Sequence, residues 1–196
     1  MKKHIVLCAL CIALPFLASA QVMRSGPLEG RWVWDGQGNQ ESEYTEMVFM
    51  GDIMLLMHSQ HPGMYFGGNF TTANQTIRFS LEPISWRYRL SGNSLIITGD
   101  DGETVTLARR EMAQSPIEGV WKKSGGDGYM VFIGDIMALT YEAGFVGTRV
   151  EFDGKWFYLS LAELVPRMEY ALNGRYLTIR MRSEEEDIEF GLVKVN

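Results

Sequence analysis

Apolar and polar residues alternate in short runs along this chain, and no stretch of convincing length has the spacing of a helix. In Trp86–Leu90, the apolar residues at 86, 88 and 90 alternate with two arginines. Successive side chains on a strand point to opposite faces, so this segment has one apolar and one charged face. The same alternation recurs at 77–81, 104–107 and 189–192. The pattern predicts β-strands with one buried face.

Residue pairs that tolerate positive φ separate these runs and indicate tight hairpins, so consecutive strands are predicted to be neighbours. The pairs are Gly51-Asp52, Gly92-Asn93, Asp101-Gly102, Gly134-Asp135, Asp153-Gly154 and Asn173-Gly174. The strands predicted in the first half are Arg31–Trp34, Thr45–Met50, Ile53–His58, Tyr65–Thr72, Thr76–Leu81, Trp86–Leu90, Leu95–Thr98 and Thr104–Arg109. The same eight are predicted in the second half, from Val120 onward.

The chain contains a long internal repeat. The octet MVFMGDIM at 47–54 returns as MVFIGDIM at 130–137, and PLEGRW at 27–32 returns as PIEGVW at 116–121. YRLSGNSLII at 88–97 matches YALNGRYLTI at 170–179, and TLARR at 106–110 matches GLVKV at 191–195. Two copies of this length are typical of a duplicated small domain rather than of a solenoid, which repeats a shorter unit several times.

Eight antiparallel strands with one apolar face can close on themselves and so remove exposed sheet edges. The predicted fold class is all-β, with two tandem eight-stranded antiparallel up-and-down barrels at 27–110 and 116–195. The polar linker 111–115 is short, so the barrels are expected to touch. In each copy the octet is interpreted as the end of the second strand, a Gly-Asp turn and the start of the third. One larger barrel or sandwich built from both copies is the alternative.

The first twenty residues have the features of a cleaved secretory signal peptide. Lys2 and Lys3 precede an apolar segment, Ile5–Leu17, and Ala18-Ser19-Ala20 supplies the small residues that signal peptidase accepts. Cleavage is expected after Ala20, with no transmembrane segment in the mature chain and a secreted or periplasmic location. Both cysteines of the chain lie in the removed segment, so the mature protein is expected to fold without disulfides.

The Glu-Gly-x-Trp segments resemble the Gly-x-Trp opening of lipocalin-like domains, and the rest of each copy is similar to compact lipocalin-like repeats of secreted bacterial proteins. The resemblance implies that Gly30 and Gly119 start the first strand of each barrel, and that Trp32 and Trp121 plug its closed end. Full lipocalins are about twice as long per barrel and enclose a ligand cavity. The inward positions here carry large side chains, which leaves little room for one.

Charge and candidate chemistry narrow the classes of function. The chain has 18 basic and 24 acidic residues and is more acidic still without Lys2 and Lys3, which disfavours nucleic acid or anionic lipid as a partner. Acidic runs in the last hairpin of each copy could hold calcium but lack the spacing of a known calcium loop. These runs are Asp100, Asp101 and Glu103, and Glu184, Glu185, Glu186 and Asp187. The expectation is no cofactor, no metal site and no catalytic residue.

The long connection between the third and fourth strands is the candidate ligand-binding segment, because flexible methionines beside aromatic rings suit adaptable apolar contacts. The candidate residues are Met54, Met57, His58, His61, Met64, Tyr65 and Phe66. The predicted function is a non-enzymatic exported binding protein for a small apolar ligand or envelope component. The alternative is a protein-interaction module, such as an inhibitor of an exported hydrolase.

Overall fold

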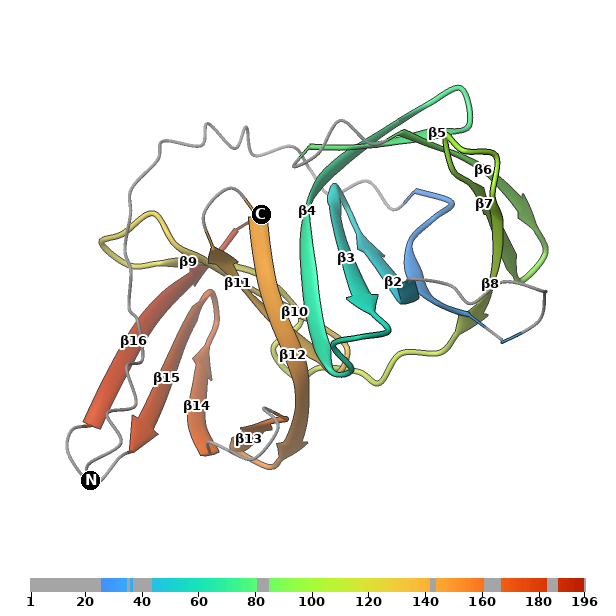
Figure 1. Cartoon of the computed structure of the whole chain (residues 1–196). Helices are drawn as coiled ribbons and strands as arrows, with labels where there is room; N and C mark the ends of the chain where they lie inside the picture. The colour runs from blue at the N-terminus through green and yellow to red at the C-terminus, as the bar shows by residue number, and fades with distance from the viewer. Residues whose placement is uncertain are drawn as a thin grey trace, which may run out of the picture.

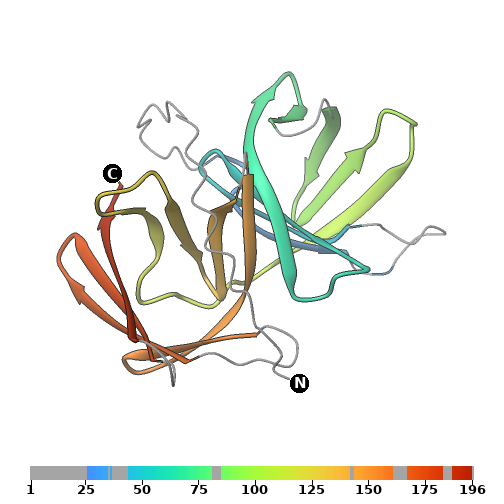
Figure 2. The same ribbon diagram turned by 60° about the vertical axis from the view of Figure 1, so that its left-hand side comes forward.

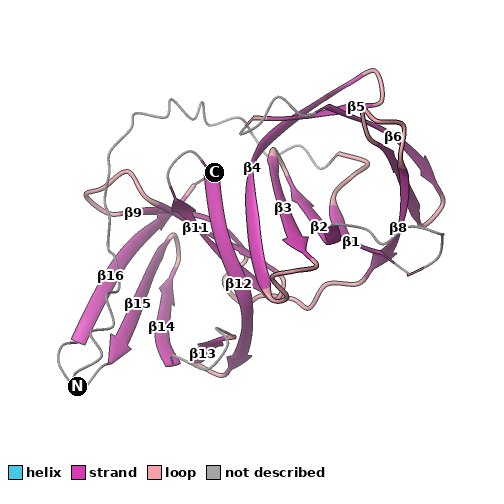
Figure 3. Cartoon of the chain, viewed as in Figure 1, coloured by secondary structure: helices cyan, strands magenta, loops and turns pink. Residues whose placement is uncertain are grey.

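The structure, a computed structural model, describes residues 26–34, 36, 44–80, 85–141, 144–160, 167–182 and 187–195. These residues form β-strands joined by turns and contain no helix, and therefore none that could cross a membrane (Figure 3). The signal segment at 1–20 lies outside the described residues.

The strands of the first half are β1 (Gly30–Trp34), β2 (Tyr44–Met50), β3 (Ile53–His58), β4 (Met64–Ala73), β5 (Thr76–Phe79), β6 (Ser85–Ser91), β7 (Ser94–Thr98) and β8 (Thr104–Arg110). Those of the second half are β9 (Gly119–Lys123), β10 (Tyr129–Ile133), β11 (Ile136–Tyr141), β12 (Gly144–Asp153), β13 (Trp156–Leu159), β14 (Arg167–Asn173), β15 (Tyr176–Arg182) and β16 (Asp187–Lys194). The octet forms the β2–β3 and β10–β11 hairpins, whose turn glycines Gly51 and Gly134 have φ of 60° and 58°. The strands and hairpins predicted from alternation are confirmed.

Each half closes into its own antiparallel ring (Figure 1). Strands β1 to β8 pair in sequence order, β8 returns to β1, and the β4–β5 pairing completes barrel 1. Strands β9 to β16 do the same, and the β11–β12 and β9–β16 pairings complete barrel 2. The predicted fold class is confirmed, and the alternative of one larger barrel is wrong.

The two barrels are joined by backbone pairing between β4 and β12, which run side by side in both views (Figures 1 and 2). Strand β5 is short and pairs only with the second half of β4, from residue 70 onward. The edge of β4 at residues 64–67 is therefore available to pair with β12. Gly67 is opposite Phe145, and Tyr65 is opposite Gly147. This register relates the two barrels by a local two-fold axis near the Phe66–Val146 pair.

The interior of each barrel is a separate apolar core. Barrel 1 is packed by Trp32, Phe49, Met54, Ile77, Leu95 and Leu107, and barrel 2 by Trp121, Phe132, Met137, Phe157, Leu177 and Ile179. The indole N–H of Trp32 donates to Leu28 O at 2.7 Å, and that of Trp121 donates to Ile117 O at 2.9 Å. Each tryptophan therefore fixes the turn that leads into its barrel while its ring lies buried in the core.

A third apolar core lies between the barrels and explains why the octet is apolar on both faces. Met47, Phe49 and Met54 point into barrel 1, whereas Val48 and Met50, on the opposite face, pack against barrel 2. The buried residues of this inter-barrel core are Val48, Met50, Ile53, Leu55, Tyr65, Val120, Val131, Ile133, Ile136 and Ala138. A strand covered on both faces needs a continuous apolar run rather than alternation. The expectation that the barrels touch is confirmed.

Equivalent glycines allow the strands beside this core to approach closely. A Cβ built on Gly67 would overlap the Met54 carbonyl oxygen, and one on Gly147 would lie 2.7 Å from Met137 O. Both glycines lie on the joined strands β4 and β12. Any side chain at either position would push β4 from β3, or β12 from β11.

Candidate functional site

The seven candidate residues lie in three different places. Met54 is buried inside barrel 1, and Tyr65 is buried between the barrels. Met57 is partly buried beside Tyr65, and its sulfur accepts a hydrogen bond from Gly63 N at 3.2 Å. The other four, His58, His61, Met64 and Phe66, lie at one end of the β3–β4 hairpin. The structure thus brings only part of the predicted segment together on the surface.

A row of rings runs across this end of barrel 1. Tyr44 lies 6.0 Å from Trp86 and 5.6 Å from His58, measured between ring centroids. His58 lies 6.0 Å from His61, which in turn lies 6.2 Å from Phe66. The turn after His58 therefore brings the two histidines together.

Phe66 continues this row into an apolar surface that both barrels share. Leu139 pairs with Val146, and Val146 pairs with Phe66, so the three side chains lie on the same face of neighbouring strands. Met64 and Tyr141 lie two residues further along β4 and β11 on that face. The exposed fractions are 38% for Met64, 41% for Phe66, 41% for Leu139 and 57% for Tyr141. We call these four residues and Val146 the seam surface.

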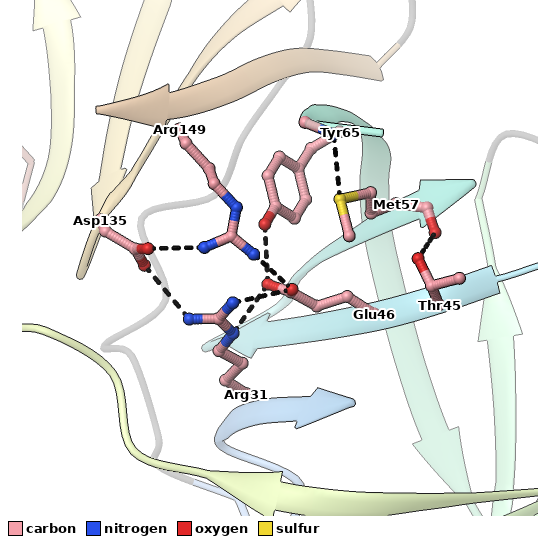
Figure 4. Close-up of polar contacts among 8 residues, drawn as sticks. Arg31, Thr45, Glu46, Met57, Tyr65, Asp135 and Arg149 are labelled. Carbon is pink, nitrogen blue, oxygen red and sulfur yellow. Dashed lines mark hydrogen bonds and ion pairs between the residues drawn. The ribbon is translucent and has the colours of Figure 1, made fainter. Parts of the chain in front are cut away.

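On the opposite face of the same strands lies a charged network that the sequence analysis missed (Figure 4). The Glu46 carboxylate is 2.9 Å from a nitrogen of Arg31 and 2.7 Å from one of Arg149, and it accepts the Tyr65 hydroxyl at 2.7 Å. Arg149 also contacts Asp135 at 2.8 Å, and Arg31 lies 3.6 Å from Asp135. Two residues of barrel 2 thus pair with Arg31 and Glu46 of barrel 1, and Tyr65 joins the network through Glu46.

Burial controls the protonation of this network. Burial raises the pKa of Tyr65, and the negative charge of Glu46 raises it further, so the hydroxyl stays protonated and donates to Glu46. Burial by itself lowers the pKa of Arg31, but the charge and hydrogen bonds of Glu46 outweigh it, and the net pKa is raised. Arg31 therefore remains a cation, and the network is a fixed structural contact between the barrels.

The charged network lies on only one side of the local two-fold axis that relates the barrels. The counterparts of Arg31, Glu46 and Tyr65 are Val120, Tyr129 and Phe145, which belong to the apolar inter-barrel core. The counterparts of Asp135 and Arg149 are Asp52 and Asn69, joined by a hydrogen bond of 3.0 Å. One half of the interface is therefore ionic and the other half apolar.

A cavity of about 230 Å³ opens at the other end of barrel 1. The turn before β1, the β2–β3 turn and the second half of β4 surround it, with Phe49, Phe70 and Tyr88 among its walls. It is smaller than the roughly 300 Å³ at which pockets for drug-sized ligands begin. The Gly-x-Trp end of barrel 1, rather than its aromatic end, carries this opening.

The acidic hairpins have a local structural role where the structure describes them. Asp101 Oδ1 accepts a hydrogen bond from Glu103 N at 2.9 Å and so closes its own turn. Of the second run, Glu184, Glu185 and Glu186 lie outside the described residues.

The chain matches no protein-family model, no curated protein and no solved structure. Its geometry alone must therefore support a function. One signal for the network was present in the sequence: Glu46 is the charged residue that interrupts an otherwise apolar face of β2. Its partner Arg149 lies more than a hundred residues away, beyond the reach of local patterns.

Proposed function

We propose that this is an exported, non-enzymatic binding protein that contacts a protein partner through the seam surface. Single exposed apolar residues are normal, but neighbouring ones on one face mark interaction sites. Met64, Phe66, Leu139 and Tyr141 are large apolar or aromatic side chains that sit together across the joint of two barrels. This clustering is the observation that carries the proposal.

The shape of the surface favours a protein over a small apolar ligand. Small ligands bind in concave sites that enclose most of their surface. The seam side chains lie on the inward faces of paired strands, where Phe66 pairs with Leu56, and the barrel interiors beneath them are packed by large side chains. Methionine and aromatic residues, of which this surface consists in large part, are enriched in the cores of protein interfaces. A small apolar ligand remains the second outcome of the test below.

A naphthalene sulfonate dye tests whether the surface binds apolar groups at all. We expect the native protein to enhance the dye's fluorescence, and F66S and L139S each to reduce this several-fold. Leu172 on β14 is exposed to a similar extent, 47%, outside the seam surface, so L172S is the matched control and should bind dye as the wild type does. Equal loss in L172S, or no dye binding by the folded protein, would contradict the proposal.

Cross-linking identifies the class of partner. A benzophenone side chain at position 139 is irradiated in concentrated culture medium and envelope extract, and the same group at position 172 serves as the control. A discrete, stoichiometric protein adduct at position 139 supports a protein partner. Excess wild-type protein should prevent this adduct from forming, and excess F66S protein should not. Adducts of lipid alone, or dye displaced by lipid extract, would show a small apolar ligand instead.

The export and family assignments belong to the same proposal. Lys2, Lys3 and the Ala18–Ala20 motif support cleavage after Ala20, and amino-terminal sequencing of the exported protein should begin at Gln21. The lipocalin-like relationship is supported by the closed eight-stranded barrels and by Trp32 and Trp121, buried beside the turns that open each barrel. An amino terminus that still contains residues 1–20 would contradict export by cleavage.

A further inference from the structure

The cavity of barrel 1 lies where a threonine replaces an aromatic residue of barrel 2. Thr72 on β4 pairs with Ile77, and its counterpart Phe152 on β12 pairs with Phe157. The ring of Phe152 lies 6.0 Å from that of Tyr170 and packs beside Phe132 and Phe157. In barrel 2 an aromatic ring thus occupies the space that Thr72 leaves open in barrel 1.

The walls left behind are aromatic on one side. Phe49 and Phe70 meet edge to face with centroids 5.1 Å apart, and Tyr88 lies across from them. In barrel 2 the hydroxyl of Tyr170 donates to Gly154 O at 2.7 Å. Within the described part of the chain, the Tyr88 hydroxyl makes no such bond. It is free to contact a molecule inside the cavity.

Two carboxylates line the cavity as well. Glu29 accepts a hydrogen bond from Gly51 N at 3.1 Å, and Asp52 accepts one from Asn69 at 3.0 Å. Neither has an ion pair with a described lysine or arginine, whereas Asp135, the counterpart of Asp52, pairs with Arg149. The cavity therefore keeps the negative charge of Asp52, whose counterpart in barrel 2 is paired with an arginine.

Arg109, a described cation at the rim of the cavity, is engaged with backbone oxygens and an aromatic ring. Arg109 stacks over the ring of Trp32, with 4.3 Å from its guanidinium carbon to the ring centroid. Its two terminal nitrogens donate to the backbone oxygens of Glu29 and Pro27 at 2.9 and 3.0 Å. The arginine thus closes the turn before β1, and among the described residues it makes no ion pair with the Glu29 carboxylate.

We propose that this cavity is a binding site for a small organic cation, an ammonium group carried on a compact apolar body. Aromatic faces attract cations through their quadrupole, and the two carboxylates add direct charge attraction. The overall excess of acidic residues increases the local concentration of cations. The volume of about 230 Å³ limits the ligand to a compact amine. This site is separate from the seam surface and does not depend on it.

Binding of benzylammonium to the full mature protein, measured by saturation-transfer NMR and calorimetry at pH 7, tests the site. Benzyl alcohol has nearly the same shape without charge, and we expect it to bind about tenfold more weakly. T72F places in barrel 1 the ring that barrel 2 has, and should abolish binding. D52N should weaken benzylammonium and leave benzyl alcohol unchanged.

T71F is the matched control, because Thr71 is exposed on the outer face of β4, next to Thr72. It adds the same ring outside the barrel and should bind benzylammonium as the wild type does. Thr72 is itself exposed at the barrel end, so T72F is expected to fold, and an unchanged unfolding midpoint verifies this. Binding that T72F retains, or equal affinity for the amine and the alcohol, would overturn the proposal.

Discussion

Replacing Glu46 by glutamine removes the negative charge that joins the two barrels. The side chain of Glu46 is 2% exposed, and its carboxylate contacts Arg31, Arg149 and Tyr65. Glutamine keeps the shape and one acceptor for Tyr65, but it leaves two guanidinium groups with Asp135 as their remaining partner. We therefore expect the free energy of unfolding to fall, chiefly through the loss of paired charge.

The size of the loss follows from how far the arginines can reach water. Removing one partner of a fully buried ion pair costs about 3–5 kcal/mol. The side chains of Arg149 and Arg31 are 31% and 16% exposed, so both recover some hydration, and Asp135 still pairs with Arg149. We expect E46Q to cost about 2–3 kcal/mol, between the values for fully buried and surface pairs. Y65F removes only one hydrogen bond and should cost about 1 kcal/mol.

Urea unfolding followed by tryptophan fluorescence measures these changes. Urea is preferred because guanidinium chloride would screen the ion pairs under test. With a urea dependence of about 2–3 kcal/mol per molar, E46Q should lower the midpoint by about 1 M. If the two barrels of the wild type unfold in a single transition, E46Q should split it into two transitions, because the network joins both barrels.

A grafted variant provides the decisive control. R31V/E46Y/Y65F/R149N replaces each network residue by its counterpart across the local two-fold axis, and the asparagine introduced at position 149 is then placed to bond Asp135 as Asn69 bonds Asp52. Buried ionic networks replaced by well-packed apolar groups are often as stable as the original or more so. We expect this variant to recover most of the stability lost in E46Q. A graft as unstable as E46Q, or an E46Q midpoint equal to the wild type, would refute the reasoning.

Three further outcomes follow from local geometry. G67A should lower the free energy of unfolding by about 3 kcal/mol or more in the same urea assay, because its Cβ would overlap the Met54 carbonyl. W32F should cost about 1–3 kcal/mol by thermal unfolding, because the buried Leu28 carbonyl loses its indole donor. Burial raises the pKa of Glu118 above its ordinary value of 4.5 in the folded protein. The folded state therefore favours the neutral carboxyl of Glu118. This contribution to the free energy of unfolding is fully present below about pH 4.5 and is lost as pH rises through the folded-state pKa. E118Q should therefore gain stability relative to the wild type between pH 4.5 and 7, and a constant difference across that range would contradict the sign.

The strands were predictable because most of them bury one face and expose the other. Alternation in Trp86–Leu90 and turn pairs such as Gly51-Asp52 carry that information locally. The joint between β4 and β12 was not predictable in the same way, since it depends on the edge that a short β5 leaves open. The continuous apolar run at Val48 and Met50 was a usable signal for a second buried face.

The candidate binding segment was only partly predictable for a related reason. The cluster of methionines and aromatics at 54–66 drew attention to the hairpin that contributes Met64 and Phe66 to the seam surface, but composition does not tell which face each side chain takes. Met54 follows the strand period into barrel 1, and Tyr65 turns toward barrel 2. Leu139 and Tyr141, which complete the seam surface, come from a hairpin without histidine or an aromatic-rich loop. Only the pairing of distant strands brings them beside Phe66.

The one-sided charge of the inter-barrel contact bears on mispairing between newly made chains. Barrel 1 of one protein molecule presents nearly the same apolar face to barrel 1 of a second molecule as it does to its own barrel 2. In such a swapped pair, Glu46 would meet Asp52 and Asn69 in place of Asp135 and Arg149, and two carboxylates would be desolvated together. Pairing of like halves is therefore penalised relative to pairing of a barrel 1 with a barrel 2.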